Sequence, residues 1–236
     1  MIGIIGGSGP EAGVDLFTKV LAEHRRRIGD CYTGDRDAPD MILFNVSALG
    51  GPRTEADVEP GSPARAASWR ALEGAVKNAL ASCDIFGIAC NTLHVFAREV
   101  AALCGDRKSA FVSIVDATID RLPPSGGGAP GVAILGGPAT TGPNSPYRVA
   151  TAPLAETERE RLQKIIWDVK RTGPSAASRA AFAGLVETLR GRGIETLVLA
   201  CTELPLVADP GATALLDPTM ALAAALLDAA AAPAGS

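Results

Sequence analysis

The chain has 236 residues, of which 47% are hydrophobic and 20% charged, so it has enough apolar material for a buried core and is neither disordered nor fibrous. Its formal net charge is −4, and only 4% of its residues are aromatic. We expect no nucleic-acid partner, because nucleic-acid binding relies on basic surfaces and aromatic stacking.

Short β-rich runs alternate with longer helical patterns, which predicts an α/β fold built on parallel strands. The predicted strands are Ile2–Ile5, Met41–Val46, Asp84–Ala89, Ala110–Val115, Gly131–Leu135, Thr196–Ala200 and Ala214–Leu216. The predicted helices are Glu11–Ile28, Ala64–Ser82, Thr92–Leu103, Glu156–Arg171, Ser175–Arg192 and Thr219–Ala231. Proline and glycine fill the stretch Leu122–Pro130, which predicts a surface connection between two halves.

The sequence has no pattern typical of a signal peptide or a membrane span. Ile2–Ile5 follows Met1 directly, without a basic segment or a long apolar segment. The most apolar tail, Ala221–Ala232, is interrupted by Asp228 and is shorter than the roughly 20 residues that a span needs. The chain has five cysteines, an odd number, which favours reduced thiols over a disulfide framework. We therefore expect a cytoplasmic protein with no membrane partner.

Two short segments recur in the second half of the chain. Ile4–Gly7 recurs as Ile134–Gly137, and Ile88–Thr92 recurs as Leu199–Thr202, each time at the end of a predicted strand. The two repeats favour an internal duplication, and their unequal spacing indicates different insertions in the two halves. Chance similarity between short α/β segments remains the alternative.

The second repeat places Cys90 and Cys201 at equivalent positions. In parallel sheets the ligand site lies beyond the carboxyl ends of the strands, where the N-termini of helices lower the pKa of a thiol. The neighbouring Asn91, Thr92 and Thr202 are suited to holding a carboxylate. The remaining cysteines are interpreted as structural: Cys31, Cys83 and Cys104.

Two thiols facing each other across a cleft can invert a stereocentre without a cofactor, because one removes a proton from carbon while the other supplies a proton to the opposite face. No metal site is predicted, since the chain lacks a Cys-x-x-Cys motif and has only two histidines, His24 and His94. His94 lies one helical turn after Cys90, where it either orients groups near the site or packs as a satisfied core residue.

Three segments resemble the aspartate/glutamate racemase superfamily, specifically its aspartate racemase branch: Met1–Ala12, Ala89–His94 and Ala200–Pro205. The resemblance implies two Rossmann-like parallel-sheet domains related by pseudo-twofold symmetry. The first would comprise residues 1–116 and 210–236 and carry Cys90, and the second residues 117–209 and carry Cys201. The resemblance also implies cofactor-independent, two-base racemisation of L- and D-aspartate, in a homodimer.

The resemblance further implies a cationic clamp for the distal carboxylate of a small anionic amino acid. Arg53 offers a planar fork, and Lys170, with Arg171 as the alternative, offers a compact charge. The family often has Met at the position of Ser8, and the segment around Thr140 is unusually rich in proline. The predicted substrate-binding residues are Ser8, Pro52, Arg53, Thr54, Asn91, Thr92, Thr140, Lys170 and Thr202. The long connection Ser47–Ser62 is predicted to cover the site and to carry Arg53 inward.

Other functions remain open from the sequence. A glutamate racemase, a broad-specificity amino-acid or hydantoin racemase and a maleate isomerase would use the same two cysteines. From another class, Gly7–Ala12 fits a dinucleotide-binding fingerprint, which allows a nucleotide- or small-molecule-binding α/β protein. The second strand ends near Asn45, without the acidic residue expected to bind a ribose.

Overall fold

The computed structural model describes residues 1–50, 59–123, 131–209 and 215–232, and contains two parallel β-sheets. The first has the order β2-β1-β3-β4 and the second the order β5-β6-β7. The strands are β1 Ile2–Gly6, β2 Met41–Asn45, β3 Ile85–Ile88, β4 Phe111–Val112, β5 Val132–Ile134, β6 Thr196–Val198 and β7 Leu215–Leu216. The predicted α/β class with parallel sheets is confirmed.

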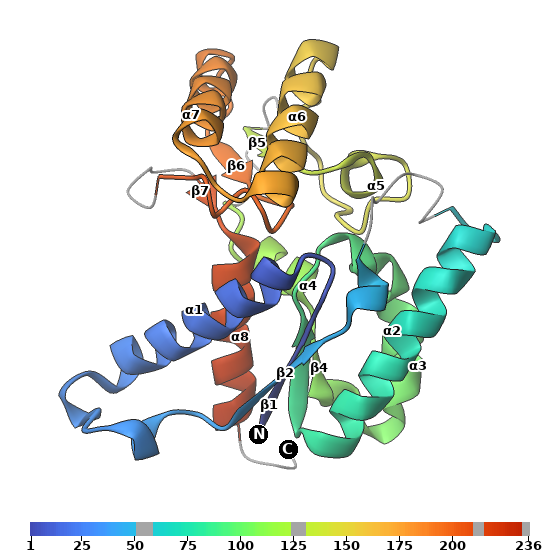
Figure 1. Ribbon diagram of the computed structural model, residues 1–236, viewed down its shortest axis with the longest axis vertical. Coiled ribbons are helices and arrows are strands. Elements are labelled where there is room, and N and C mark those ends of the chain that lie inside the picture. Colours follow the sequence, from blue (N-terminus) through green and yellow to red (C-terminus); the bar gives the residue numbers. More distant parts are fainter. Residues whose placement is uncertain (51–58, 124–130, 210–214, 233–236) are drawn as a thin grey trace.

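Helices cover both faces of the first sheet (Figure 1). The helices are α1 Pro10–Ile28, α2 Pro63–Ser82, α3 Ala97–Cys104, α4 Ile114–Ile119, α5 Pro138–Thr141, α6 Glu156–Thr172, α7 Ala176–Gly191 and α8 Pro218–Ala231. One face packs against α1 and α8, and the other against α2 and α3. In the second sheet one face packs against α6 and α7, while Ile134 and Val198 on the other face join the core formed with α1 and α8. The two sheets therefore share a core. None of the described helices is long and apolar enough to cross a membrane.

The two sequence repeats occupy equivalent positions in the two sheets. In the first sheet Ile4 pairs with Gly87, and in the second Ile134 pairs with Val198. Ile134 is the counterpart of Ile4 in the first repeat, and Val198 is the counterpart of Gly87, directly before the second repeat. Both halves therefore pair their strands in the same register. The turns that follow β3 and β6 consequently begin at matching places, and each carries a cysteine.

Two predicted elements were wrong in extent. The predicted strand Ala110–Val115 is only two residues long, because the Ser113 hydroxyl accepts a hydrogen bond from the Asp116 backbone and starts α4, which was not predicted. The predicted helix Thr92–Leu103 begins as a 3₁₀ turn over Thr92–Phe96 and continues as α3. The short helix α5 was also not predicted.

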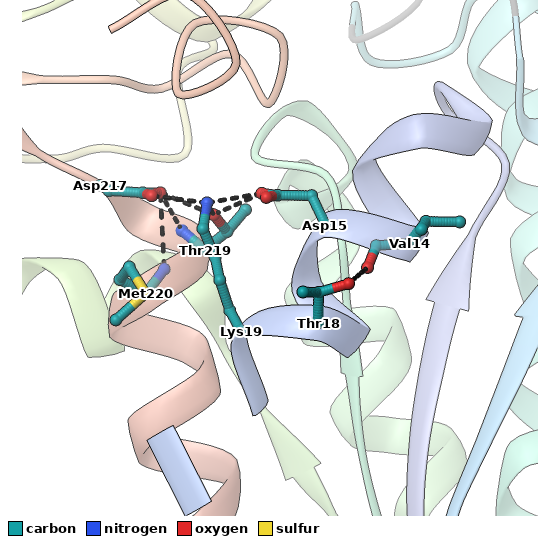
Figure 2. Close-up of polar contacts among 7 residues, drawn as sticks. All are labelled: Val14, Asp15, Thr18, Lys19, Asp217, Thr219 and Met220. Carbon is teal, nitrogen blue, oxygen red and sulfur yellow. Dashed lines mark hydrogen bonds and ion pairs between the residues drawn. The ribbon is translucent and has the colours of Figure 1, made fainter. Parts of the chain in front are cut away.

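A network of charged side chains ties α8 to α1 (Figure 2). The Lys19 ammonium donates to Asp15 at 2.5 Å and to Asp217 at 2.6 Å. Asp217 caps α8 by accepting from the backbone of Thr219 and Met220. Lys19 is mostly buried between the two carboxylates, so replacing it would leave both carboxylates without their ammonium partner. The predicted domain bounds stay a prediction.

Candidate active site

A cavity of about 230 Å³ lies where the carboxyl ends of strands from both sheets meet α6. It is smaller than the roughly 300–1,000 Å³ typical of pockets for drug-sized ligands, so it suits a small metabolite. The cavity is lined by seven of the predicted site residues, namely Ser8, Cys90, Asn91, Thr92, Lys170, Cys201 and Thr202. Lys170 lies on α6, and the other six follow the ends of β1, β3 and β6.

Cys90 lies just after β3, and its side chain is buried. Its thiol donates to the Ser8 hydroxyl at 3.3 Å. Ser8 reaches this position through a turn in which Gly7 and Gly9 adopt left-handed φ angles of 106° and 103°. A Cβ atom at Gly7 would lie 2.1 Å from the Val46 carbonyl oxygen, so the close approach of these two segments requires glycine.

Cys201 has a different neighbour. Its thiol donates to Oε2 of Glu203 at 2.9 Å. Burial, followed by the negative charge of Glu203, raises the pKa of Cys201 well above its usual value, and Lys170 opposes this shift only in part. The prediction that a following helix favours the Cys201 thiolate was wrong, because turns rather than a helix occupy residues 202–208. The burial and the adjacent carboxylate therefore both favour the protonated thiol of Cys201.

Glu203 forms an ion pair with Lys170 through its other carboxylate oxygen, Oε1. The Glu203 side chain is 8% exposed and that of Lys170 is 30% exposed. Desolvation lowers the pKa of Lys170, but the adjacent Glu203 outweighs it and raises the pKa. The pair packs against Gly9, where a Cβ atom would lie 2.9 Å from Oε1. Sequence reasoning missed Glu203, although it lies within the motif around Cys201.

Lys170 lines the cavity, whereas its sequence alternative Arg171 is not among the lining residues. Pro52, Arg53 and Thr54 lie outside the described residues, as does half of the predicted covering loop, residues 51–58. Within the described part of the site, the charge of Lys170 is paired with Glu203, and the cationic clamp stays a prediction.

Asn91 carries a buried hydrogen-bond donor with no partner. Its Oδ1 accepts from the Tyr147 hydroxyl at 2.6 Å, while no described group pairs with its Nδ2. Burial raises the pKa of Tyr147, so this hydroxyl keeps its proton. Because an unpaired buried N–H is costly, Asn91 is ready to bind an acceptor such as a carboxylate. Tyr147 was not predicted as a site residue.

Thr92 and Thr140 share a hydrogen bond 2.7 Å long between their hydroxyl groups. Thr92 lines the cavity, but Thr140 does not. Thr140 is therefore connected to the site through its hydrogen bond with Thr92. Thr202 lines the same cavity beside Cys201.

His94 is held by backbone groups at both ring nitrogens. Nε2 accepts from the Ile114 backbone N–H at 3.1 Å, which places the proton on Nδ1, and Nδ1 donates to the Cys90 carbonyl at 2.9 Å. Burial lowers the pKa of His94 to about 4. Of the two interpretations, His94 is the satisfied core residue, and it also holds the backbone of Cys90.

The glycine turn at the start of α1 is poorly suited to a pyrophosphate. The Glu203 carboxylate lies against Gly9, and Glu11 lines the neighbouring pocket that contains Gly7 and Gly9. The charge of Glu203 is paired with Lys170, so Glu11 is the carboxylate that would repel a nucleotide phosphate. Among residues 1–50, 59–123, 131–209 and 215–232, no group of three or more His, Cys, Asp or Glu side chains has the arrangement of a metal site.

Comparison with known proteins gives a family and a fold. A family model described as Asp/Glu/Hydantoin racemase matches residues 5–226. A proposed Asp/Glu racemase from Yersinia pestis has a similar structure, with a TM-score of 0.72 and 21% identity over 97% of this chain and 98% of that chain. An aspartate racemase homologue from Pyrococcus horikoshii OT3 gives a TM-score of 0.68 and 22% identity over 98% and 99% of the two chains.

Proposed function

We propose that this chain, which belongs to the Asp/Glu/hydantoin racemase family, interconverts L- and D-aspartate without pyridoxal phosphate by a two-cysteine, two-base mechanism. The observation that carries the proposal is the convergence of Cys90 and Cys201, from two different sheets, on one cavity. A homodimer is part of the proposal.

The reaction places the substrate Cα between the two thiols. One sulfur, as thiolate, removes the Cα proton, while the other, as thiol, gives a proton to the opposite face, and the two exchange roles for the other enantiomer. The unpaired Asn91 Nδ2 and the hydroxyls of Thr92 and Thr202 are suited to the α-carboxylate. Lys170, together with Arg53 from outside the described residues, would hold the distal carboxylate.

The test is a racemisation assay followed by circular dichroism, with the enantiomers of aspartate and glutamate and without added pyridoxal phosphate. We expect aspartate to be the preferred substrate. Cys90→Ala and Cys201→Ala should each lower turnover by about 10²–10⁴-fold, the range typical of a lost acid–base group.

Cys31→Ala is the matched control, because Cys31 is exposed and is not among the residues lining the cavity. Its activity should equal that of the parent chain. Full activity in Cys201→Ala would rule out the two-base mechanism. Faster turnover of glutamate, a hydantoin or maleate would keep the fold and replace the proposed substrate.

A further inference from the structure

One face of α6 forms a wall of the cysteine cavity, the cavity of about 230 Å³ that Cys90 and Cys201 line. The lining residues of α6 are spaced three and four positions apart, which places them on one face of the helix: Gln163, Ile166, Trp167 and Lys170. Gln163 and Ile166 line only the cysteine cavity, whereas Trp167 and Lys170 also line a second pocket of about 340 Å³. The boundary between the two pockets therefore lies near the C-terminal end of α6.

The other walls place this boundary at the same point. Ser8 lines the cysteine cavity, while Gly7 and Gly9 on either side of it line the second pocket. Cys201 lines only the cysteine cavity. Among the described residues, three line both pockets: Trp167, Lys170 and Glu203.

Trp167 is the residue of these three whose bulk closes the boundary. Lys170 and Glu203 are held by their ion pair with each other. Trp167 is uncharged and has the largest side chain of the three. It is 45% exposed, although tryptophan is usually highly buried in folded proteins. Its exposed surface is therefore available for contact with a ligand.

We propose that Trp167 limits the length of the substrate side chain. This inference rests on the proposed function, in which Cα lies between Cys90 and Cys201 and Lys170 holds the distal carboxylate at the boundary. An aspartate side chain ends there. A side chain that is one methylene longer would press its carboxylate against the indole. One methylene typically changes the discrimination between two substrates by about 10–200-fold.

The second pocket adds a smaller effect of charge. Glu11 lines this pocket, so a carboxylate that passed the indole would meet a like charge. Because Glu11 is exposed, solvent and salt screen this repulsion. Steric exclusion by Trp167 is therefore the larger of the two effects, and its removal should be sufficient to admit the longer side chain.

The experiment compares the binding of succinate and glutarate, which are the skeletons of aspartate and glutamate without the amino group and differ by one methylene. Isothermal titration calorimetry measures both Kd values, whether or not the chain racemises an amino acid. The parent chain should bind succinate at least about 10-fold more tightly than glutarate. Trp167→Ala should reduce this preference to less than about 3-fold, and Trp167→Phe, which keeps an aromatic ring, should retain most of it. Both variants should fold, because nearly half of Trp167 is exposed.

Trp69→Phe is the matched control. The chain has two tryptophans, and Trp69 packs against Phe96 with 5.5 Å between the ring centroids. Trp69 is not among the residues that line either pocket, so Trp69→Phe should keep the preference of the parent chain. In this variant Trp167 is the remaining tryptophan, and its fluorescence should change when succinate binds.

Turnover should show the same effect. Trp167→Ala should raise the kcat/KM of glutamate relative to that of aspartate about 10-fold, and this ratio decides the question where the dicarboxylates bind too weakly to measure. An unchanged preference in Trp167→Ala, in a chain that still racemises aspartate, would overturn the length limit and leave the proposed function intact. Bound succinate that leaves the fluorescence of Trp167 unchanged would also overturn it. A preference for succinate that depends on Trp167, in a chain that racemises no amino acid tested, would support the length limit and reject the proposed reaction.

Discussion

Acidification should destabilise the fold through His94. The side chain is 4% exposed, and both ring nitrogens are occupied by backbone partners in the neutral tautomer. Burial lowers the pKa of His94 to about 4, whereas an unfolded chain has a histidine pKa of about 6.5. Between these two pH values, His94 binds a proton in the unfolded state but stays neutral in the folded state.

The sign and the magnitude follow from this difference. The stabilising effect of neutral His94 is fully present above about pH 6.5, falls as the pH decreases, and stops falling below about pH 4, where the folded state also takes up the proton. The shift from about 6.5 to about 4 corresponds to about 3 kcal/mol of unfolding free energy. This is a large part of the roughly 5–15 kcal/mol that stabilises a typical domain.

The assay is urea denaturation at a series of pH values across this window, for the parent chain and for His94→Gln, which keeps one donor and one acceptor. The parent should lose about 3 kcal/mol more than the variant. Glu23, whose pKa is lowered to about 2 mainly by its hydrogen bond with Arg26, adds a loss of stability only as the pH falls from about 4.5 to about 2. Equal slopes for the parent and His94→Gln between pH 6.5 and 4 would refute the assignment of a buried neutral His94.

Two further predictions concern residues that contact the lining of the cavity from behind. Tyr147→Phe removes the hydroxyl that donates a hydrogen bond to Asn91, and KM should rise about 3–10-fold, as expected for the loss of one hydrogen bond. An unchanged KM in steady-state assays would show that Asn91 does not need this hydrogen bond. Gly9→Ala places a Cβ atom against Glu203 at a left-handed φ, so urea denaturation should show a loss of about 1–3 kcal/mol in the free energy of unfolding. Gly74→Ala is the control, because Gly74 lies in the middle of α2 with open space around its Cβ position, and it should be neutral or stabilising. A destabilisation at Gly74 equal to that at Gly9 would contradict this reasoning.

The sequence predicts the strand ends that carry the two cysteines because this information is local and repeated. Apolar runs mark β3 and β6, and the matching segments around Cys90 and Cys201 correspond to one pairing register. The start of α4 was missed because a serine cap interrupts an otherwise β-like run.

The polar partners of the site were harder to predict because they depend on tertiary packing. Tyr147 meets Asn91 across 56 residues of sequence, and Lys170 meets Glu203 across 33. No periodicity or motif encodes such a pairing. Glu203 could have been predicted from the sequence, because it lies two residues after Cys201 and so puts a carboxylate next to a reactive thiol.

The shared strand register and the local partners of each sulfur therefore govern different properties of this site. The shared register places Cys90 and Cys201 equivalently, which is what a symmetric exchange of protons between two faces of a carbon requires. The hydrogen-bond partners of the two sulfurs differ instead, a hydroxyl for Cys90 and a carboxylate for Cys201. The equilibrium constant of racemisation is one, so these unequal neighbours cannot favour either product. They can change only the binding and the turnover rate of each enantiomer. The two enantiomers should thus differ in kcat and KM while sharing one value of kcat/KM, and Glu203→Gln should change the two kcat values unequally.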